Sequence, residues 1–229
     1  DTRLSRGLGD VYKRQSKNPL ALFKKEVSEE EVLNSPIMWP GVMTRLMACP
    51  PTCGGAAAIL VSEKFAKKHN IDASVKILAQ SMTTDYESTF AEKDMMQLVG
   101  YDMTKEAARD VYSQTGVDVQ DVDVVELHDC FAHNELITYE ALGLCEEGEA
   151  QKFVHDGNNT FGGKFVTNPS GGLLSKGHPL GATGLAQCFE LTQQLRGNAG
   201  EKQVEGAKTA LQHNLGLGGA CVTTLYQTR

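Results

Sequence analysis

A glycine-rich stretch, Asn168 to Gly184, presents a histidine in a setting that suits chemistry. It reads NPSGGLLSKGHPLGATG and packs five glycines around the pair His178-Pro179. Glycine allows positive φ and a close approach of the backbone to a ligand, and proline fixes φ, so this stretch can hold one side chain rigidly. An imidazole titrates near neutral pH without special perturbation. The alternative is a glycine-rich turn with a solvated histidine.

A second loop, His128-Asp129-Cys130-Phe131, follows the apolar run DVDVVEL and precedes a helical pattern. A cysteine near a helix N-terminus, with an imidazole beside it, can have its pKa lowered toward the range useful for proton transfer or attack. The alternative is an inert buried cysteine with Asp129 capping the helix. Free cysteine is often only a small apolar residue.

A third stretch, His213 to Gly219, reads HNLGLGG between two apolar runs. Its backbone N–H groups can line an oxyanion hole if the chain turns sharply there, although glycines between strands are also ordinary bulges. Together the three loops suggest acyl chemistry, because a thiol and an imidazole exchange protons near neutral pH while N–H donors stabilise an oxyanion. The other histidines, without a spacing such as HExxH, are expected to be structural and to bind no metal; they are His69, His133 and His155.

Composition indicates an ordinary globular protein. The chain has 229 residues, 41% hydrophobic and 22% charged, with a net charge of −7. This charge, without a basic cluster among aromatics, argues against nucleic-acid binding. No apolar run reaches the roughly 20 residues that a transmembrane helix needs. The six cysteines form no CxxC pair, which favours a reducing, intracellular compartment over a disulfide or zinc framework.

Hydrophobic patterning predicts strands that alternate with helices, typical of a layered α/β domain. The expected strands are 56–61, 74–84, 121–127, 207–211 and 221–226. The expected helices are 28–35, 62–70, 95–101, 105–115, 131–143 and 182–196. Residues 1–15 show no clean period and resemble translated adapter sequence, so we expect a non-native or unstructured lead there.

The three loops together resemble the C-terminal half of thiolases, specifically the sterol carrier protein x type. HDCF (128–131), GHPLGATG (177–184) and HNLGLGGA (213–220) carry the resemblance. It runs nearly continuously from about Asn18 to Tyr226 and includes CPPTCGGAAAIL. It implies a thiolase-like layered α/β/α fold with a mixed five-stranded sheet in the C-terminal half, preceded by the tail end of the N-terminal half.

The resemblance also implies roles for individual residues. His178 matches the histidine that activates the nucleophilic cysteine and helps to form the first oxyanion hole, which His128 would assist. Cys130 matches the acid/base cysteine of this subfamily. Gly216 aligns with the glycine of the usual CxG motif, whose N–H contributes to a second oxyanion hole. Asn214 stands where that motif has its cysteine, a departure consistent with Cys130 having taken over the role.

A larger departure is that no CxS motif, the nucleophile of thiolases, occurs in the chain. Cys49, Cys53 and Cys145 have the wrong contexts, and Cys221 is expected in the core. We therefore expect a fragment that is inactive in thiolysis by itself. The expected organisation is a lead at 1–15, the end of the loop insertion and the last strand and helix of the N-terminal domain at 16–73, and the C-terminal domain at 74–229.

The function that the resemblance implies is acyl-CoA C-acyltransfer in lipid or sterol side-chain β-oxidation, cleaving 3-ketoacyl-CoA with CoA. Coenzyme A would be a co-substrate, with no bound cofactor, and the full-length protein would be a peroxisomal homodimer, with mitochondrial or cytoplasmic placement as alternatives. The alternative function is a non-catalytic module that binds acyl-CoA or lipid. A flavodoxin- or Rossmann-like nucleotide binder is disfavoured because no GxGxxG opens a helix after a strand.

Overall fold

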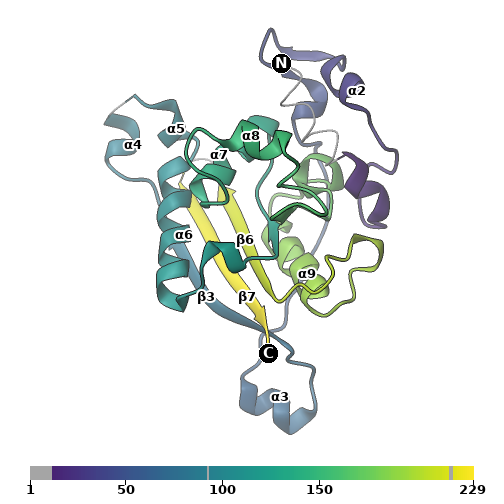
Figure 1. Cartoon of the computed structure of the whole chain (residues 1–229), viewed down its shortest axis with the longest axis vertical. Helices are drawn as coiled ribbons and strands as arrows, with labels where there is room; N and C mark the ends of the chain where they lie inside the picture. The colour runs from purple at the N-terminus through teal and green to yellow at the C-terminus, as the bar shows by residue number, and fades with distance from the viewer. Residues whose placement is uncertain (1–11, 92, 217–218) are drawn as a thin grey trace.

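A five-stranded mixed sheet forms the centre of the structure, a computed structural model that describes residues 12–91, 93–216 and 219–229 (Figure 1). The strands lie in the order β3-β7-β6-β4-β5. Strand β7 is antiparallel to β3 and β6, whereas β4 is parallel to β6 and β5. Their bounds are β3 Val75–Thr83, β4 Val124–Glu126, β5 Val166–Thr167, β6 Thr209–Gly216 and β7 Ala220–Thr228. The predicted α/β class and mixed five-stranded sheet are confirmed.

Helices cover both faces of this sheet because the side chains of a strand alternate between its faces. Val125 of β4 and Leu211 of β6 pack in one cluster with the helices α6, α7 and α8. Their neighbours Val124 and Ala210 pack on the opposite face with α9. The bounds are α6 Tyr101–Thr115, α7 Ala132–Ala141, α8 Ala150–His155 and α9 Thr183–Leu195. The result is the three-layered α/β/α arrangement that the resemblance implied.

Glycines set both ends of α6. Gly100, with φ 88°, precedes its first residue, and Gly116, with φ 68°, ends it. Both glycines take the left-handed conformation, which costs glycine little. The helix therefore begins at Tyr101 rather than at the predicted Lys105. The short helices α4 (Ser88–Ala91) and α5 (Met95–Leu98) precede it.

Two short helices before the sheet follow their predicted caps. Helix α2 (Glu29–Leu33) has a complete capping box, in which Ser28 accepts from the N–H of Glu31 and the Glu31 side chain accepts from the N–H of Ser28. Helix α3 (Glu63–His69) is capped by Ser62 and ends at Asn70, whose φ is 51°. The other elements of this region are η1 Gln15–Lys17, β1 Ile37–Trp39, β2 Met43–Thr44 and η2 Arg45–Met47.

The expected lead at 1–15 differs from the structure in its last four residues. Residues 12–14 are helical and continue into η1, and the Tyr12 side chain is buried against Met47 and Leu174. Arg14 is also buried, and its Nε and Nη2 atoms have no hydrogen-bond partner among the described residues. Residues 1–11 lie outside the described residues.

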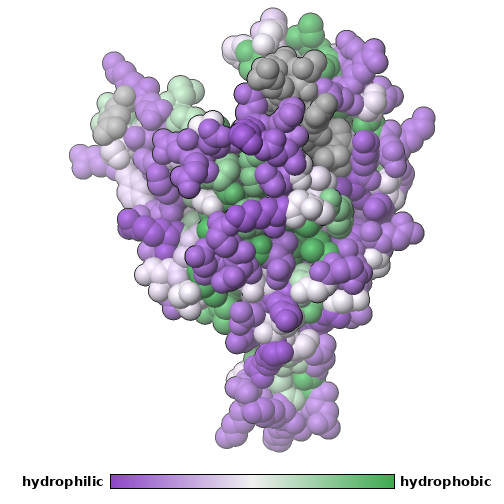
Figure 2. Space-filling model, viewed as in Figure 1, coloured by the Kyte–Doolittle hydropathy of each residue, from purple (hydrophilic) through white to green (hydrophobic). Residues whose placement is uncertain are grey.

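The predicted buried strand at 56–61 does not form within this chain. This segment pairs with no strand among the described residues, and Ile59 and Leu60 are 91% and 78% exposed. A strand needs a partner for its backbone N–H and C=O groups, and this segment has none in the part of the chain that the structure describes. With α3 it belongs to the projection at the bottom of Figure 1, where hydrophobic residues show among hydrophilic ones in Figure 2.

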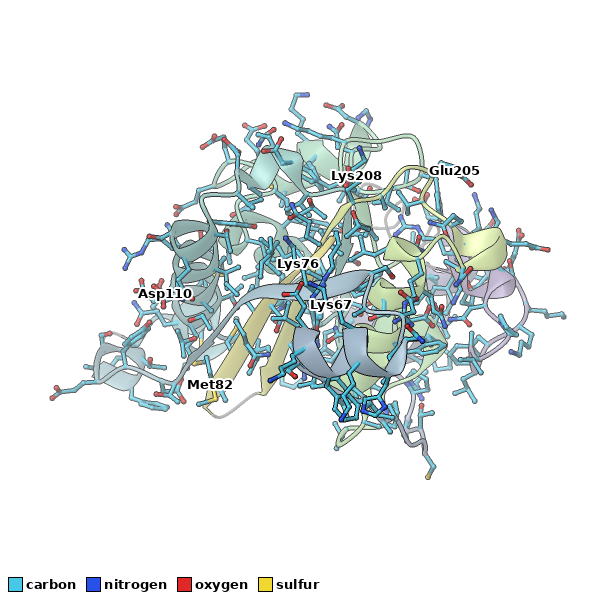
Figure 3. All side chains as sticks on the ribbon, turned by 90° about the horizontal axis from the view of Figure 1, so that it is seen from below. Lys67, Lys76, Met82, Asp110, Glu205 and Lys208 are labelled. Carbon is cyan, nitrogen blue, oxygen red and sulfur yellow. The ribbon has the colours of Figure 1, made fainter. Side chains whose placement is uncertain are left out.

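Strand β3 forms one edge of the sheet, and α6 is fastened to it. Ser81 of β3 donates a hydrogen bond to Asp110 of α6 at 3.0 Å. Figure 3 shows Asp110 on α6 beside this edge and Met82 near the end of the strand.

Among the described residues, no helix has the length and apolar character needed to cross a membrane.

Candidate active site

The carboxyl ends of β4 and β6 bring His128 and Asn214 together. Parallel pairing places Glu126 of β4 opposite Gln212 of β6. Two residues beyond this pair, the same register places His128, after β4, beside Asn214 of β6. The Nδ1 of His128 lies 2.8 Å from the Oδ1 of Asn214. Ends of parallel strands at one edge of a sheet are the usual location of sites in such folds.

The third predicted loop begins as a strand. His213 to Gly216 belong to β6, which pairs with β7 as far as Gly216 opposite Ala220. Side chains alternate along a strand, so Gly216 lies on the same face of β6 as Asn214. Because it is a glycine, no side chain occupies this position of the face. Residues 217 and 218 of this turn lie outside the described residues.

The glycine-rich stretch is anchored on β4. Asn168 (φ 45°) accepts a hydrogen bond from the N–H of Leu127 at 2.8 Å. Ser170 donates from its N–H and its hydroxyl to the buried carboxylate of Glu126, at 3.1 and 2.8 Å. A π-helical turn, η4 (Gly172–Lys176), then leads to Gly177 and His178. These contacts fix the stretch at the same edge of the sheet as His128.

The structure brings His128 and His178 into direct contact. Their ring centroids lie 4.9 Å apart, and the rings stand edge to face at 90°. The Nδ1 of His178 lies 2.7 Å from the hydroxyl of Thr183, the first residue of α9. Two of the four predicted site residues therefore form one constellation.

The hydrogen bonds of these rings assign their protons. The Thr183 hydroxyl lies 3.2 Å from the carbonyl of Pro179, and when it donates there it accepts from the Nδ1–H of His178. The Nε2 of a neutral His178 then carries a lone pair and acts as a base. His128 likewise places Nδ1 2.8 Å from the Oδ1 of Asn214, which accepts a hydrogen bond when Nδ1 carries the proton.

Burial keeps both rings neutral. It lowers the pKa of His128 to about 4, against a partly opposing effect of Asn214. Burial also lowers the pKa of His178, and the ammonium of Lys176 adds to this. Neutral imidazoles are the form that accepts a proton from a nucleophile.

We expect the titration of His128 to be visible both in NMR and in stability. In unfolded chains histidine has a pKa of about 6.5, whereas burial holds that of His128 at about 4. Between these two pH values the histidine is protonated in the unfolded state and neutral in the folded state. The stability contributed by the neutral ring is present above about pH 6.5 and is lost as the pH falls toward about 4.

The measurement is an NMR titration of the imidazole signals combined with urea unfolding between pH 4 and pH 8, which spans both values. The variant His128→Asn should flatten the acid limb of the unfolding free energy. His155→Asn, at a histidine that is 55% exposed, is the matched control and should leave the limb unchanged. A midpoint for His128 near the ordinary histidine value of about 6.5 would contradict the assignment.

Cys130 follows His128 by two residues in the same loop, but its pKa moves in the direction opposite to the prediction. The residue is 5% exposed, and burial, the largest cause, raises its pKa to about 12. Helix α7 begins at Ala132 after Phe131, but its N-terminus does not offset the loss of hydration. The lowered pKa expected from the helix N-terminus is therefore wrong, and the resting group is a thiol.

The segment 48–52 covers both loops and contains the site residues that sequence reasoning missed. Ala48 pairs antiparallel with Phe131, and the N–H of Cys49 donates to the carbonyl of Cys130 at 2.9 Å. Pro51 forms a parallel bridge with His178, whose N–H donates to Thr52 at 3.3 Å. Only the small-residue turn CPPTCGG marked this segment in the sequence.

Close packing explains two of the glycines. A Cβ on Gly177, which has φ 118°, would lie 2.9 Å from the Thr52 side chain. A Cβ on Gly184 would lie 3.0 Å from the amide nitrogen of Asn214. Glycine at these positions lets the segment 48–52 and β6 approach the loop that holds His178.

Other candidates lie outside the constellation. Cys221 is buried in β7, as expected, with its Sγ 3.7 Å from the hydroxyl of Thr104. The same hydroxyl lies 3.0 Å from the Nε2 of His213, which is buried in β6. Among the described residues, no three His, Cys, Asp or Glu side chains gather closely enough to hold a metal ion.

Curated relatives cover almost all of this chain. "Sterol carrier protein 2" of Oryctolagus cuniculus is 59% identical over 218 residues, 94% of this chain and 40% of the relative. "Non-specific lipid-transfer protein-like 2" of Caenorhabditis elegans is 49% identical over 213 residues, 92% and 51%. "Acetyl-CoA acetyltransferase" of Methanothermobacter thermautotrophicus is 37% identical over 216 residues, 94% and 55%. The chain therefore spans about half the length, or less, of these relatives.

Solved structures share the fold. The "Ltp2-ChsH2(DUF35) aldolase" aligns with 99% of this chain and 58% of its own, with a TM-score of 0.84 at 20% identity. The acetyl-CoA acetyltransferase of Bacillus anthracis aligns with 100% of this chain and 56% of its own, with a TM-score of 0.72 at 17% identity. At these identities the likeness establishes the fold alone.

A family model described as "Thiolase C-terminal domain-like" matches residues 84–227, well over half of the chain. The match includes β4, α7, the glycine-rich stretch, α9 and the β6–β7 pair, which are the elements that position the two histidines and Cys130. The chain therefore belongs to the thiolase C-terminal domain-like family.

Proposed function

We propose that this chain carries the proton-transfer and oxyanion-binding half of a thiolase, an acyl-CoA C-acyltransferase that cleaves 3-ketoacyl-CoA with CoA. The observation that carries the proposal is the edge-to-face contact of His128 and His178 at 4.9 Å, with the buried Cys130 two residues after His128 in the same loop. The relative named acetyl-CoA acetyltransferase supports acyl-CoA chemistry. The relatives named for sterol and lipid transfer support lipid substrates, and we propose branched or sterol-derived acyl chains.

In the proposed reaction the nucleophile comes from outside this chain, which has no CxS motif. His178 takes the proton of that cysteine at Nε2, and the thiolate attacks the 3-keto carbonyl carbon. The bond between C2 and C3 then breaks, and its electron pair leaves as the enolate of acetyl-CoA. Cys130 donates a proton to C2 of that enolate. Its thiolate then takes the proton of the CoA thiol, the sulfur of CoA displaces the acyl group from the nucleophile, and protonated His178 returns the proton to the released cysteine thiolate.

The geometry suits these two proton transfers. The Nε2 of neutral His178 is a base, because its Nδ1–H is held by Thr183. Burial raises the pKa of Cys130 to about 12 and so keeps it protonated, which is the form that an enolate needs in a donor. The two groups thus start in complementary states, one ready to accept a proton and the other to give one.

An oxyanion-binding role for His128 places a condition on Asn214. To donate from Nε2, a neutral His128 must accept at Nδ1, so the side-chain amide of Asn214 must present its nitrogen rather than its oxygen. The two orientations differ by a half-turn of the amide, and at 2.8 Å either makes a hydrogen bond. We propose that this half-turn accompanies binding of the substrate carbonyl.

We also propose that 16–73 ends a first thiolase half and that 74–229 is the second. The unpaired backbone of 56–61 and the exposure of Ile59 and Leu60 support this, because such a segment suits a strand whose sheet is supplied by another part of the protein. The intact protein would be a peroxisomal homodimer acting in β-oxidation, with CoA as co-substrate.

The test compares this chain with a chimera in which residues 16–229 replace the matching segment of the rabbit relative. The chain alone should release no acetyl-CoA from a 3-ketoacyl-CoA and CoA, because the nucleophile is missing. The chimera should cleave the substrate in a CoA-dependent reaction at a rate within about tenfold of the unmodified rabbit protein.

A folded chimera that does not cleave substrate, while the rabbit protein does, would overturn the enzymatic proposal. If that chimera still binds acyl-CoA in calorimetry, the non-catalytic binding module replaces it. Cleavage by the 229-residue chain alone would contradict the assignment of the nucleophile to another segment.

A further inference from the structure

The HDCF loop contains a buried carboxyl group that the proposed reaction does not use. Asp129 lies between His128 and Cys130 and is 0% exposed. Its Oδ1 accepts a hydrogen bond from the N–H of Leu173 at 2.7 Å. Its Oδ2 is buried and has no hydrogen-bond partner among the described residues. It does not cap α7, which follows Phe131 without a side-chain cap.

The carboxyl group fastens one catalytic loop to the other. Leu173 belongs to η4, the turn that leads directly to Gly177 and His178. Gly172, with φ 59°, has no room for a Cβ because both oxygens of Asp129 lie against it. Asp129 therefore connects the loop of Cys130 to the backbone that carries His178, through one hydrogen bond and one close contact.

The surroundings of Asp129 favour its neutral form. Burial raises its pKa well above the ordinary value, and the carboxyl groups of Glu135 and Glu126 raise it further, against the hydrogen bond from Leu173. The titratable groups that interact with it come from every side: Glu126 of β4, Cys130 of its own loop, Glu135 of α7, Cys49 of the covering segment, and Tyr12. None of these is a cation that would pair with a carboxylate.

We propose that Asp129 is a positioning residue that works as a neutral carboxylic acid. It holds the Cys130 loop against the backbone leading to His178, and in this form it puts no negative charge beside the thiol of Cys130. A carboxylate there would oppose the thiolate that Cys130 becomes after it gives up its proton. The catalytic consequence rests on the proposed function, whereas the neutral state and the fastening do not.

The first experiment measures urea unfolding of this chain from pH 5 to pH 9, for the wild type, Asp129→Asn and Asp121→Asn. Asparagine keeps the acceptor for Leu173 and is neutral at every pH. Asp121 is an exposed acid in the turn before β4, so Asp121→Asn is the matched control. An unfolded aspartate has a pKa of about 3.9 and releases its proton throughout this range.

The sign of the effect follows from the raised pKa. Where the folded state keeps a proton that the unfolded state has released, the stability due to Asp129 falls as the pH rises. The unfolding constant of the wild type should therefore increase relative to Asp129→Asn, by up to about tenfold per pH unit, until Asp129 ionises in the folded state. Asp121→Asn should show no such divergence. Parallel curves for the wild type and Asp129→Asn would overturn the neutral state.

The second experiment uses the chimera and separates fastening from charge. Asp129→Asn should keep kcat within about threefold at neutral pH, whereas Asp129→Ala, which leaves the N–H of Leu173 without its acceptor, should lose at least about tenfold in kcat with little change in KM. Equal kcat in both variants would overturn the positioning role. A chimera inactive with the native Asp129 would count against the proposed function, while the unfolding curves would still decide the state of Asp129.

Discussion

Replacing His178 with alanine in the chimera should lower kcat for thiolysis by about 10²- to 10⁴-fold, the usual loss on removal of a positioned acid or base. The Nδ1 of His178 contacts the Thr183 hydroxyl, which leaves the Nε2 lone pair to accept a proton. Without it the incoming cysteine must ionise unaided, and the ring that contacts His128 at 4.9 Å is lost from the oxyanion-binding pair. The measurement is steady-state release of acetyl-CoA together with the size of the first-turnover burst.

The fold should survive this change. The His178 side chain is half-buried and belongs to none of the hydrophobic clusters among the described residues, and its backbone contacts with Thr52 and Pro51 remain in the variant. Circular dichroism and the urea midpoint should therefore match those of the parent. His155→Ala, at an exposed histidine of α8 outside the site, is the control and should turn over normally. Parent rates in His178→Ala would falsify the assignment of His178 as the base.

Local signals predicted several elements of the fold. Ser28 with Glu31, and Ser62 with Asn70, mark the ends of two helices by capping chemistry that involves only neighbouring residues. The alternation of apolar side chains in β4 and β6 likewise follows from strand geometry. Because β4 and β6 are parallel and in register, the pairing of His128 with Asn214 follows from the order of the sheet, although no local pattern shows that order.

The predictions that did not hold share a cause. Each feature is decided by contacts between residues that are distant in the sequence. The run 56–61 has the composition of a buried strand, but a strand forms only against a partner. The pKa of Cys130 was predicted from the helix that follows it, whereas the burial by the segment containing Cys49 decides its direction. The covering segment 48–52, which includes Thr52, has no periodic pattern in its sequence that would predict its contact with the catalytic loops.

Replacing Cys130 with alanine should be as damaging as the loss of His178, but at a different step. In the chimera the loss in kcat should again be about 10²- to 10⁴-fold. If Cys130 moves the proton at C2 of acetyl-CoA, the parent should exchange the methyl protons of acetyl-CoA with deuterium from the solvent. Cys130→Ala should not exchange them, whereas His178→Ala should be limited in formation of the acyl-enzyme.

The exchange separates this role from a merely structural one. Cys130 is buried against the segment 48–52, so alanine removes one sulfur atom from a packed position and should cost roughly 1–2 kcal/mol of unfolding free energy. Cys145→Ala, at another thiol whose pKa burial raises to about 12, is the matched control, because Cys145 lies beyond the end of α7 and away from both histidines. It should show a comparable change in stability and normal exchange. Exchange at the parent rate in Cys130→Ala would assign the proton at C2 to another group, and Cys49, whose N–H binds the Cys130 carbonyl at 2.9 Å, would be the next thiol to replace.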